Sequence, residues 1–329
     1  MPRIYLFTKL AIFGFLAAAL FLALHHVNKL HEESSRREEE KVETYNLQST
    51  SAEHRCLYNS GPASTPIPKI VHLIWLENAE INFMAYLTIR SALVSIQPDI
   101  INLHYTVLNH KNEWLKKLRD NITLVQHDLA QEYSRQMDEK WKITHISDLL
   151  RLDVINREGG IYVDMDVILL RHFDNLLQSP KDLILGNEGG DRHGLCNAII
   201  LGRPGSSFVQ RWRESYRTFS RHEWNYHSVT LPKELSTQYT DEICSLSPAV
   251  FFWPSWTKRH IEYMHKPISD NETREFETTI ADNRGAIFPT QLAYHAWSQV
   301  AAKYLRNLSI ERVMSENTRF NILVRRFLE

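Results

Sequence analysis

The sequence predicts an α/β protein in which helices flank a largely parallel central sheet, as a single globular domain behind an N-terminal membrane anchor and a stem. From residue 69 onward, short apolar runs of strand length alternate with segments of helical periodicity. That alternation is typical of helices packed on a parallel sheet. An apolar run near the N-terminus predicts the anchor, and 329 residues leave room for one large domain behind it.

Composition and charge exclude several classes of protein. A hydrophobic content of 43% with 23% charged residues describes an ordinary globular chain, not a disordered or fibrous one. The formal net charge of -1 provides no positive field to attract nucleic acid, so we expect no nucleic-acid partner. The three cysteines, Cys56, Cys196 and Cys244, allow at most one intrachain disulfide, and their pairing stays open. No CxxC spacing indicates a zinc site.

The N-terminal region indicates the subcellular location of the protein. Residues 10–24 are uninterrupted apolar residues, and with 4–7 they approach the roughly 20 residues that a membrane-spanning helix needs. We predict a cytoplasmic tail over 1–9 and a retained signal-anchor over 10–27. A cleaved signal peptide is the alternative, but Leu-Ala-Leu-His-His is a poor cleavage site. Lys and Arg flank both ends, so orientation rests on the chemistry predicted below.

Residues 28–65 are polar and contain too few large apolar side chains to form a core, so we predict a stem there and the globular domain over 66–329. Glycosylation triplets begin at Asn121, Asn271 and Asn307. Such triplets also arise by chance, but they agree with a luminal domain.

The predicted elements follow one another closely along the first half of the domain. They are a strand over 69–75, a helix over 82–96 that stops before Pro98, a strand over 103–108, a helix over 113–119 and a strand over 122–125. A further helix over 144–158 ends at Gly159 and Gly160, because glycine tolerates the left-handed conformation there. A strand then begins at 161–163. Beyond Phe208 the pattern predicts only scattered helices.

Two aspartates, Asp164 and Asp166, directly follow this last apolar strand. Residues two apart in an extended chain point to the same side, so both carboxylates are predicted to meet one ligand. Nearby carboxylates repel each other unless a cation lies close, and oxygen ligands suit Mn²⁺ or Mg²⁺. Ligands also gather at the carboxyl ends of strands in open α/β sheets. A divalent-metal site is therefore predicted; the simpler alternative is that the aspartates cap a turn.

The surrounding segment resembles a known family. Ser147-Asp-Leu-Leu-Arg151, followed by Gly159-Gly-Ile-Tyr-Val-Asp-Met-Asp166, is similar to the sugar-binding region of the DXD glycosyltransferases. That family includes α1,4-galactosyl-, α1,4-N-acetylglucosaminyl- and initiating α-mannosyltransferases of the Golgi. The resemblance is strong over 143–171, patchy over 66–300 and does not cover the first 65 residues.

Three shorter segments add to this resemblance. Pro68–Trp75 resembles the first strand of the family, Cys196–Leu201 the segment after the DXD, and Tyr294–Trp297 its C-terminal His-x-Trp. The resemblance implies a GT-A-like fold, a nucleotide-sugar donor, a divalent metal, Mn²⁺ or Mg²⁺, and retention of anomeric configuration. The residues that it assigns to catalysis are Asp164 and Asp166, to the metal Asp164, Asp166 and His295, and to the donor Asp148, Arg151, Gly160, Tyr162 and Asn197.

Simpler interpretations of the same residues stay open. Asp148 and Arg151 lie at i and i+3 of a helix, where a surface ion pair is common. Asn197 is equally well explained as a satisfied loop amide. His295 is explained by hydrogen bonding within an aromatic cluster near Trp297.

We expect a UDP-sugar in preference to GDP-mannose as donor, a glycan or glycolipid as acceptor, and a type II protein of the Golgi membrane with a luminal catalytic domain. A homodimer is left open. Two alternatives remain. The first is a catalytically inactive, membrane-tethered sugar-binding protein. The second is a HAD-type phosphatase, which Val163-Asp-Met-Asp166 also resembles, but three predicted strands precede this motif and no acidic metal motif follows it.

Overall fold

A computed structural model describes residues 48–58, 65–219 and 225–328 of the chain. The predicted cytoplasmic tail over 1–9, the anchor over 10–27 and most of the stem lie outside these ranges. Within them, no helix combines the length and the apolar character that crossing a membrane requires.

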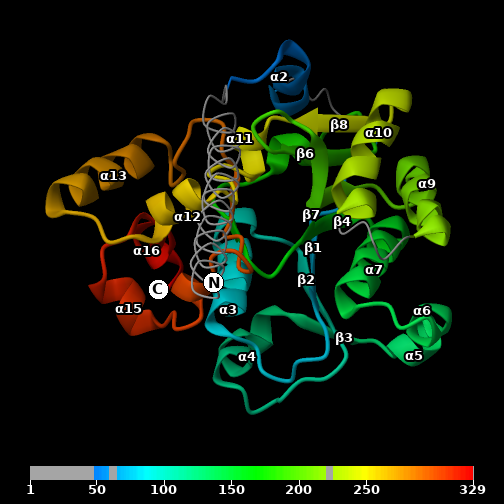
Figure 1. Ribbon diagram of the computed structural model, residues 1–329, viewed down its shortest axis with the longest axis horizontal. Coiled ribbons are helices and arrows are strands. Elements are labelled where there is room, and N and C mark those ends of the chain that lie inside the picture. Colours follow the sequence, from blue (N-terminus) through cyan, green and yellow to red (C-terminus); the bar gives the residue numbers. More distant parts are fainter. Residues whose placement is uncertain (1–47, 59–64, 220–224, 329) are drawn as a thin grey trace, which may run out of the picture. The chain divides into compact units, whose positions relative to one another are not determined.

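The described part of the chain contains a seven-stranded sheet with the order β3-β2-β1-β4-β7-β6-β8 (Figure 1). Only β7 runs antiparallel to its neighbours in this sheet, so the predicted largely parallel sheet is confirmed. A second, two-stranded sheet pairs β5 with β9. The strands are β1 (Ile70–Trp75), β2 (Ile100–Tyr105), β3 (Thr123–Gln126), β4 (Gly160–Val163), β5 (Val167–Leu169), β6 (Leu183–Glu188), β7 (Gly194–Gly202), β8 (Ile243–Leu246) and β9 (Ala293–His295).

Helices cover both faces of the large sheet (Figure 1). In the figure, α7, α9 and α10 lie on one side of it, and α3 with the C-terminal helices α12, α15 and α16 on the other. The helices are α2 (Ser51–Tyr58), α3 (Phe83–Ser91), α4 (Glu113–Leu118), α5 (Leu129–Glu132), α6 (Ser134–Asp138), α7 (Ile143–Glu158), α8 (Asp174–Leu177), α9 (Ser207–Ser215), α10 (Leu231–Gln238), α11 (Pro248–Phe251), α12 (Lys258–His265), α13 (Asp270–Asp282), α14 (Ala302–Leu305), α15 (Ile310–Ser315) and α16 (Arg319–Val324).

The period-two alternation of β4 divides the core between these two layers. Ile161 and Val163 belong to the apolar cluster that includes α3 and the C-terminal helices. Tyr162 points the other way, into the cluster formed with α7 and α9. The next residue of the same parity, Asp164, is therefore directed toward the α7 side of the sheet.

Most elements of the first half match their prediction within about one residue. The helix predicted over 82–96 is α3, capped by the Asn82 side chain, followed by a π-helical turn over Ala92–Ile96. The strand predicted over 103–108 is displaced, because β2 pairs in register with β1 from Ile100 to Tyr105 and leaves the sheet where β1 ends.

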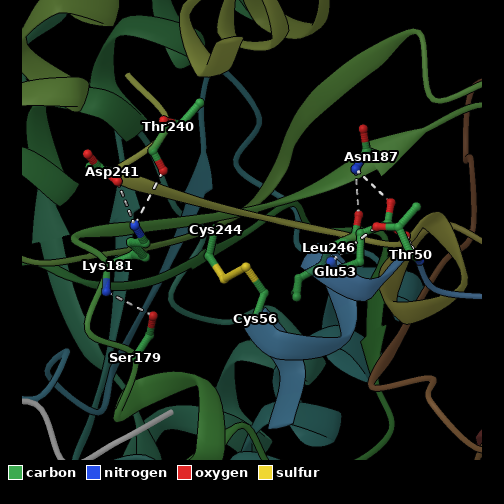
Figure 2. The surroundings of a disulfide bond; sticks show 10 residues. All are labelled: Thr50, Glu53, Cys56, Ser179, Lys181, Asn187, Thr240, Asp241, Cys244 and Leu246. Atoms are coloured by element: carbon green, nitrogen blue, oxygen red, sulfur yellow. Dashed lines mark hydrogen bonds and ion pairs between the residues drawn. A yellow bond between two sulfur atoms is a disulfide. The ribbon is translucent and has the colours of Figure 1, made fainter. Parts of the chain in front are cut away.

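The helix α2 belongs to the folded part of the chain although it falls within the predicted stem. A disulfide joins Cys56 of α2 to Cys244 of β8, 188 residues apart (Figure 2). The buried Glu53 of α2 also accepts a hydrogen bond from Arg192 at 2.6 Å. These contacts attach α2 to the globular part of the described chain. Cys196, on β7, is buried and unpaired.

Three buried histidines form a line across neighbouring parallel strands, with His72 on β1, His104 on β2 and His127 directly after β3. His72 Nε2 lies 3.0 Å from the Gly159 carbonyl oxygen, and His72 Nδ1 lies 3.1 Å from His104 Nε2. His104 Nδ1 lies 2.9 Å from His127 Nε2, and His127 Nδ1 lies 2.8 Å from the Glu132 carboxylate. The line therefore joins the end of α7 to α5.

The hydrogen bonds along this line need more protons than three neutral imidazoles carry. Its ends, a carbonyl and a carboxylate, are both acceptors, so its four contacts need four protons. Three neutral imidazoles supply only three. The line therefore holds one proton more than its three neutral rings would supply. Burial lowers the pKa of His72 and, with the adjacent histidines, lowers that of His104 to about 3.

We predict that this line makes stability depend on pH. A histidine whose pKa is lowered by folding stabilises the protein fully above its unfolded pKa of about 6.5, and this stabilisation is lost as pH falls toward 3. Each such proton changes the free energy of unfolding by about 1.4 kcal/mol per pH unit. His104→Gln should reduce the slope between pH 6 and pH 4 by about that amount, measured by urea unfolding.

The exposed His172 provides the control for this measurement. His172→Gln should leave the slope as it is in the unmodified chain. Equal slopes for His104→Gln and the unmodified chain would contradict the account.

Candidate active site

The connection from α7 to β4 places two helical residues beside the end of the strand. Gly159 and Gly160 have φ values of +66° and +104°, so they end α7 in the left-handed region and reverse the chain as predicted. Since β4 then runs back along α7, its carboxyl end returns to the first half of the helix. Asp148 and Arg151 of α7 consequently lie next to Asp164.

Gly160 itself does not lie at this end of the strand. It is buried at the start of β4, and a Cβ atom there would come within 2.5 Å of the Ile70 carbonyl oxygen and 3.2 Å of His72 Nε2. The structure thus gives Gly160 a backbone role, the close approach of β4 to β1, and does not bring it to the other predicted donor-binding residues.

The segment Asp164–Asp166 is not extended, and the geometry predicted for it is wrong. Asp164 follows β4, Met165 and Asp166 form a turn, and the amide of Val167 donates to the Asp164 carbonyl oxygen at 3.1 Å. The two carboxylates still lie close to one another at this turn, directly before β5. A turn, and not the predicted extended segment, therefore brings the two carboxylates together.

The pairing of β5 with β9 adds a third group to the two aspartates. Val167 faces His295 in this antiparallel pair, which sets the imidazole beside Asp166 across 129 positions of sequence. Ligand atoms of Asp164, Asp166 and His295 all lie within 4.8 Å of one another. The three predicted metal ligands are thus assembled at one place.

Both carboxylate oxygens of Asp166 accept hydrogen bonds. Oδ1 lies 3.1 Å from His295 Nε2, and Oδ2 accepts from the Ser298 amide at 2.8 Å. Burial by itself would raise the pKa of Asp166, but His295 and Ser298 lower it to about 2. Burial likewise opposes protonation of His295, yet the Asp166 carboxylate outweighs it and raises the pKa of the imidazole.

The Arg151 guanidinium is buried and connects α7 to the two strands. It donates to Asp164 Oδ1 at 3.0 Å and to the Asn197 carbonyl oxygen at 3.1 Å, and it lies 3.3 Å from Asp148 Oδ1. Its charge also lies 4.6 Å from the centre of the Tyr162 ring. Asp148 is only 8% exposed and Arg151 only 6%, so this is no surface ion pair.

The predicted donor-binding residues other than Gly160 gather around this guanidinium. The Asn197 amide donates to Asp148 Oδ1 at 2.7 Å, and the Tyr162 hydroxyl donates to Asp164 Oδ1 at 2.5 Å. Asn197 is therefore part of the buried network rather than a loop amide. Burial raises the pKa of Asp164, and the nearby Asp166 adds to that rise while Arg151 opposes it. Such a rise indicates negative charge that a nearby cation would stabilise.

The donor set fits a divalent cation. Two carboxylates and one imidazole are ligands that Mn²⁺ accepts. Within the described residues, the hydrogen bonds of Asp164 fall on Oδ1, which leaves Oδ2 for a metal. His295 is also part of an aromatic cluster, because the centre of its ring lies 3.9 Å from that of the Trp297 ring. This packing is compatible with a role as a metal ligand.

Two cavities meet at Asp164. The first, about 330 Å³, is lined by the polar groups of Asp148, Arg151 and Asn197 and by the apolar side chains of Ile74, Leu76 and Ile143, among others. The second, about 640 Å³, lies beyond Asp166 and His295. Asp164, Ser228 and Gln299 line both, so the two cavities adjoin at Asp164, one of the predicted metal ligands.

Several residues of the site were not predicted from the sequence. Ser298 directly follows the His-x-Trp segment, whose resemblance was the one available signal for it. Glu188, at the end of β6, and Trp256, in the segment after α11, also line the second cavity. No local pattern singles them out, because long-range packing brings them there.

Comparison with known proteins agrees with this geometry. The family described as "Glycosyltransferase sugar-binding region containing DXD motif" matches residues 85–182. The "Glucan organizing enzyme 1" of Cryptococcus neoformans var. grubii is 33% identical over 279 residues, which cover 80% of this chain and 71% of that protein. The "Glycosyltransferase afumC" of Aspergillus fumigatus is 27% identical over 125 residues, 32% of each chain.

The chain belongs to the glycosyltransferases whose sugar-binding region contains a DXD motif. Membership of this family argues against the alternative of a HAD-type phosphatase. Among solved structures, "PaToxG Glycosyltransferase" covers 90% of this chain and 97% of its own at 16% identity, with a TM-score of 0.43.

We predict that Arg151 is essential to the stability of this site. Arg151→Met would leave the buried Asp148 and Asp164 carboxylates without their counter-charge, and such a change costs about 3–5 kcal/mol. Arg213→Met is the matched control, because Arg213 also pairs with an aspartate, Asp153, at 2.7 Å, but both are about one-third exposed. It should cost less than about 1 kcal/mol. Urea unfolding measures both, and equal losses would refute the role of Arg151.

Proposed function

We propose that the chain is a retaining, divalent-metal-dependent glycosyltransferase of the GT-A type. It moves a hexose or N-acetylhexosamine from a nucleotide-sugar, a UDP-sugar in preference to GDP-mannose, to a glycan or glycolipid acceptor. The observation that carries this proposal is the meeting of two cavities at the Asp164–Asp166–His295 cluster. The first is lined by polar and apolar side chains, which suits a nucleotide-sugar donor, and the second is assigned to the acceptor in this proposal.

The donor lies in the first cavity in this proposal. The base of the nucleotide packs against the apolar side chains of Ile74, Leu76 and Ile143. Its sugar hydroxyls hydrogen-bond to Asp148 and Arg151, which are held rigidly by Asn197 and by each other. A buried, mutually bonded set of this kind keeps its geometry when substrate binds, so little free energy is lost in ordering it.

Asp164, Asp166 and His295 would hold the metal, Mn²⁺ or Mg²⁺, beside the diphosphate. A divalent cation at this place neutralises the charge that develops on the departing diphosphate. The Ser298 amide and the Trp297 ring keep Asp166 and His295 in position. Asp164 joins the two functions, since it also accepts hydrogen bonds from Arg151 and Tyr162.

In the transfer step, the bond between the anomeric carbon and the diphosphate oxygen breaks, and the acceptor hydroxyl oxygen bonds to that carbon. For retention we favour attack from the leaving-group face, with the proton of the hydroxyl passing to a diphosphate oxygen. The developing positive charge on the sugar resembles that of glycoside hydrolysis. Isolation of a covalent glycosyl-enzyme would replace this step by a double displacement.

We further propose a Golgi-membrane, type II location with the catalytic domain in the lumen. Its support is the Cys56–Cys244 disulfide, which is typical of oxidising compartments, and the exposure of Asn121, Asn271 and Asn307. A peptide N-glycosidase that leaves the mobility of the expressed chain unchanged would count against it.

We predict that turnover of one donor requires both a metal and Asp166. The full chain is to be screened with UDP- and GDP-sugars, with and without Mn²⁺, by release of nucleotide and transfer to oligosaccharides. Asp166→Asn should lower kcat/KM at least about 100-fold, because it removes a ligand charge and the partner of His295. The exposed Asp120→Asn is the control and should retain turnover.

A folded chain that binds sugars but turns over no donor would support the inactive sugar-binding alternative. Turnover that is indifferent to metal and to Asp166 would contradict the mechanism while leaving the transferase class intact.

A further inference from the structure

Glu188 is a buried carboxylate that the proposed donor site does not use. It ends β6, its residue is 9% exposed, and it lines the second cavity together with Asp164, Asp166 and His295. Glu188 thus lines the cavity that contains all three predicted metal ligands and does not line the proposed donor cavity.

Within the described ranges, the Glu188 carboxylate has no ion-pair partner. Its neighbour is the Cys196 thiol, whose pKa is raised by burial first and then by the Glu188 charge and hydrogen bond. A thiol is a weak hydrogen-bond donor. The carboxylate oxygens therefore keep the capacity to accept hydrogen bonds from a ligand.

The rest of the second cavity indicates the chemistry of that ligand. Trp256 and Trp297 meet edge to face with their ring centres 5.4 Å apart, and both line the cavity. The lining also includes neutral hydrogen-bonding side chains, namely Asn82, Asn225, Ser228, Ser298 and Gln299. Broad aromatic surfaces with a few amides and hydroxyls suit a neutral polyhydroxylated ligand.

We propose that the second cavity binds the acceptor as a neutral saccharide and that Glu188 accepts a hydrogen bond from its hydroxyl groups, next to the tryptophan wall. This inference rests on the proposed function, because the donor is taken to fill the first cavity. Glu188 orients the acceptor; the proton of the attacking hydroxyl still leaves with the diphosphate, and no bond forms to the carboxylate.

The test measures acceptor binding directly, so that it does not depend on turnover. The full chain, with UDP and Mn²⁺ present, is titrated with neutral disaccharides and with N-glycan and glycolipid-headgroup oligosaccharides. Tryptophan fluorescence gives the dissociation constants, and saturation-transfer NMR identifies the sugar protons in contact. Glu188→Gln is compared with Glu113→Gln, an exposed glutamate of α4. The UDP dissociation constant is measured for every variant.

We expect at least one saccharide to bind the unmodified chain, and Glu188→Gln to weaken it about 10-fold or more, with the UDP dissociation constant unchanged. Glu113→Gln should bind like the unmodified chain. Saccharide binding that depends on Glu188 supports the inference even if no donor is turned over, and in that case only the proposed function fails.

Three results would overturn the inference. They are no saccharide binding by the unmodified chain, equal binding by Glu188→Gln, and a parallel loss of UDP and saccharide affinity. A sugar adduct on Glu188, found by mass spectrometry, would also overturn it, because it would make the residue a nucleophile.

Discussion

The site depends on one buried charge, the guanidinium of Arg151. It is the counter-ion of Asp148 and Asp164 and a donor to the main chain of β7, so it fixes α7, β4 and β7 relative to one another. A buried ion pair adds little to stability by itself, but removing one partner leaves an uncompensated charge. The arrangement thus ties the orientation of the predicted donor-binding residues to the folding of the sheet.

The second constraint is the short antiparallel pair of β5 and β9. The turn after β4 reverses the chain at Asp166, and the pairing then sets His295 against it from the C-terminal part of the sequence. Asp164 belongs to both constraints, since one of its oxygens accepts from Arg151 and Tyr162 while its neighbours are Asp166 and His295. A change in sugar binding is therefore expected to affect metal binding as well.

Local patterns were sufficient for the first half of the fold and for the centre of the site. Helix α7, the glycine pair after it and the two aspartates could be predicted because capping, periodicity and strand alternation all act over a few residues. The turn at Met165 was missed, because an apolar strand on either side looks continuous. His295 was reached only through a resemblance, and Glu188 and Trp256 not at all, since their positions depend on pairings and packing between distant segments.

The central claim is that Asp164, Asp166 and His295 bind a divalent metal beside a nucleotide-sugar. Crystals of the full chain with UDP and Mn²⁺ test it most directly, through anomalous scattering at the manganese edge. The account predicts one peak within coordination distance of Asp166 and His295, with the diphosphate next to it and Arg151 still paired to Asp148 and Asp164. A peak elsewhere, or bound UDP with no peak between these residues, would contradict it.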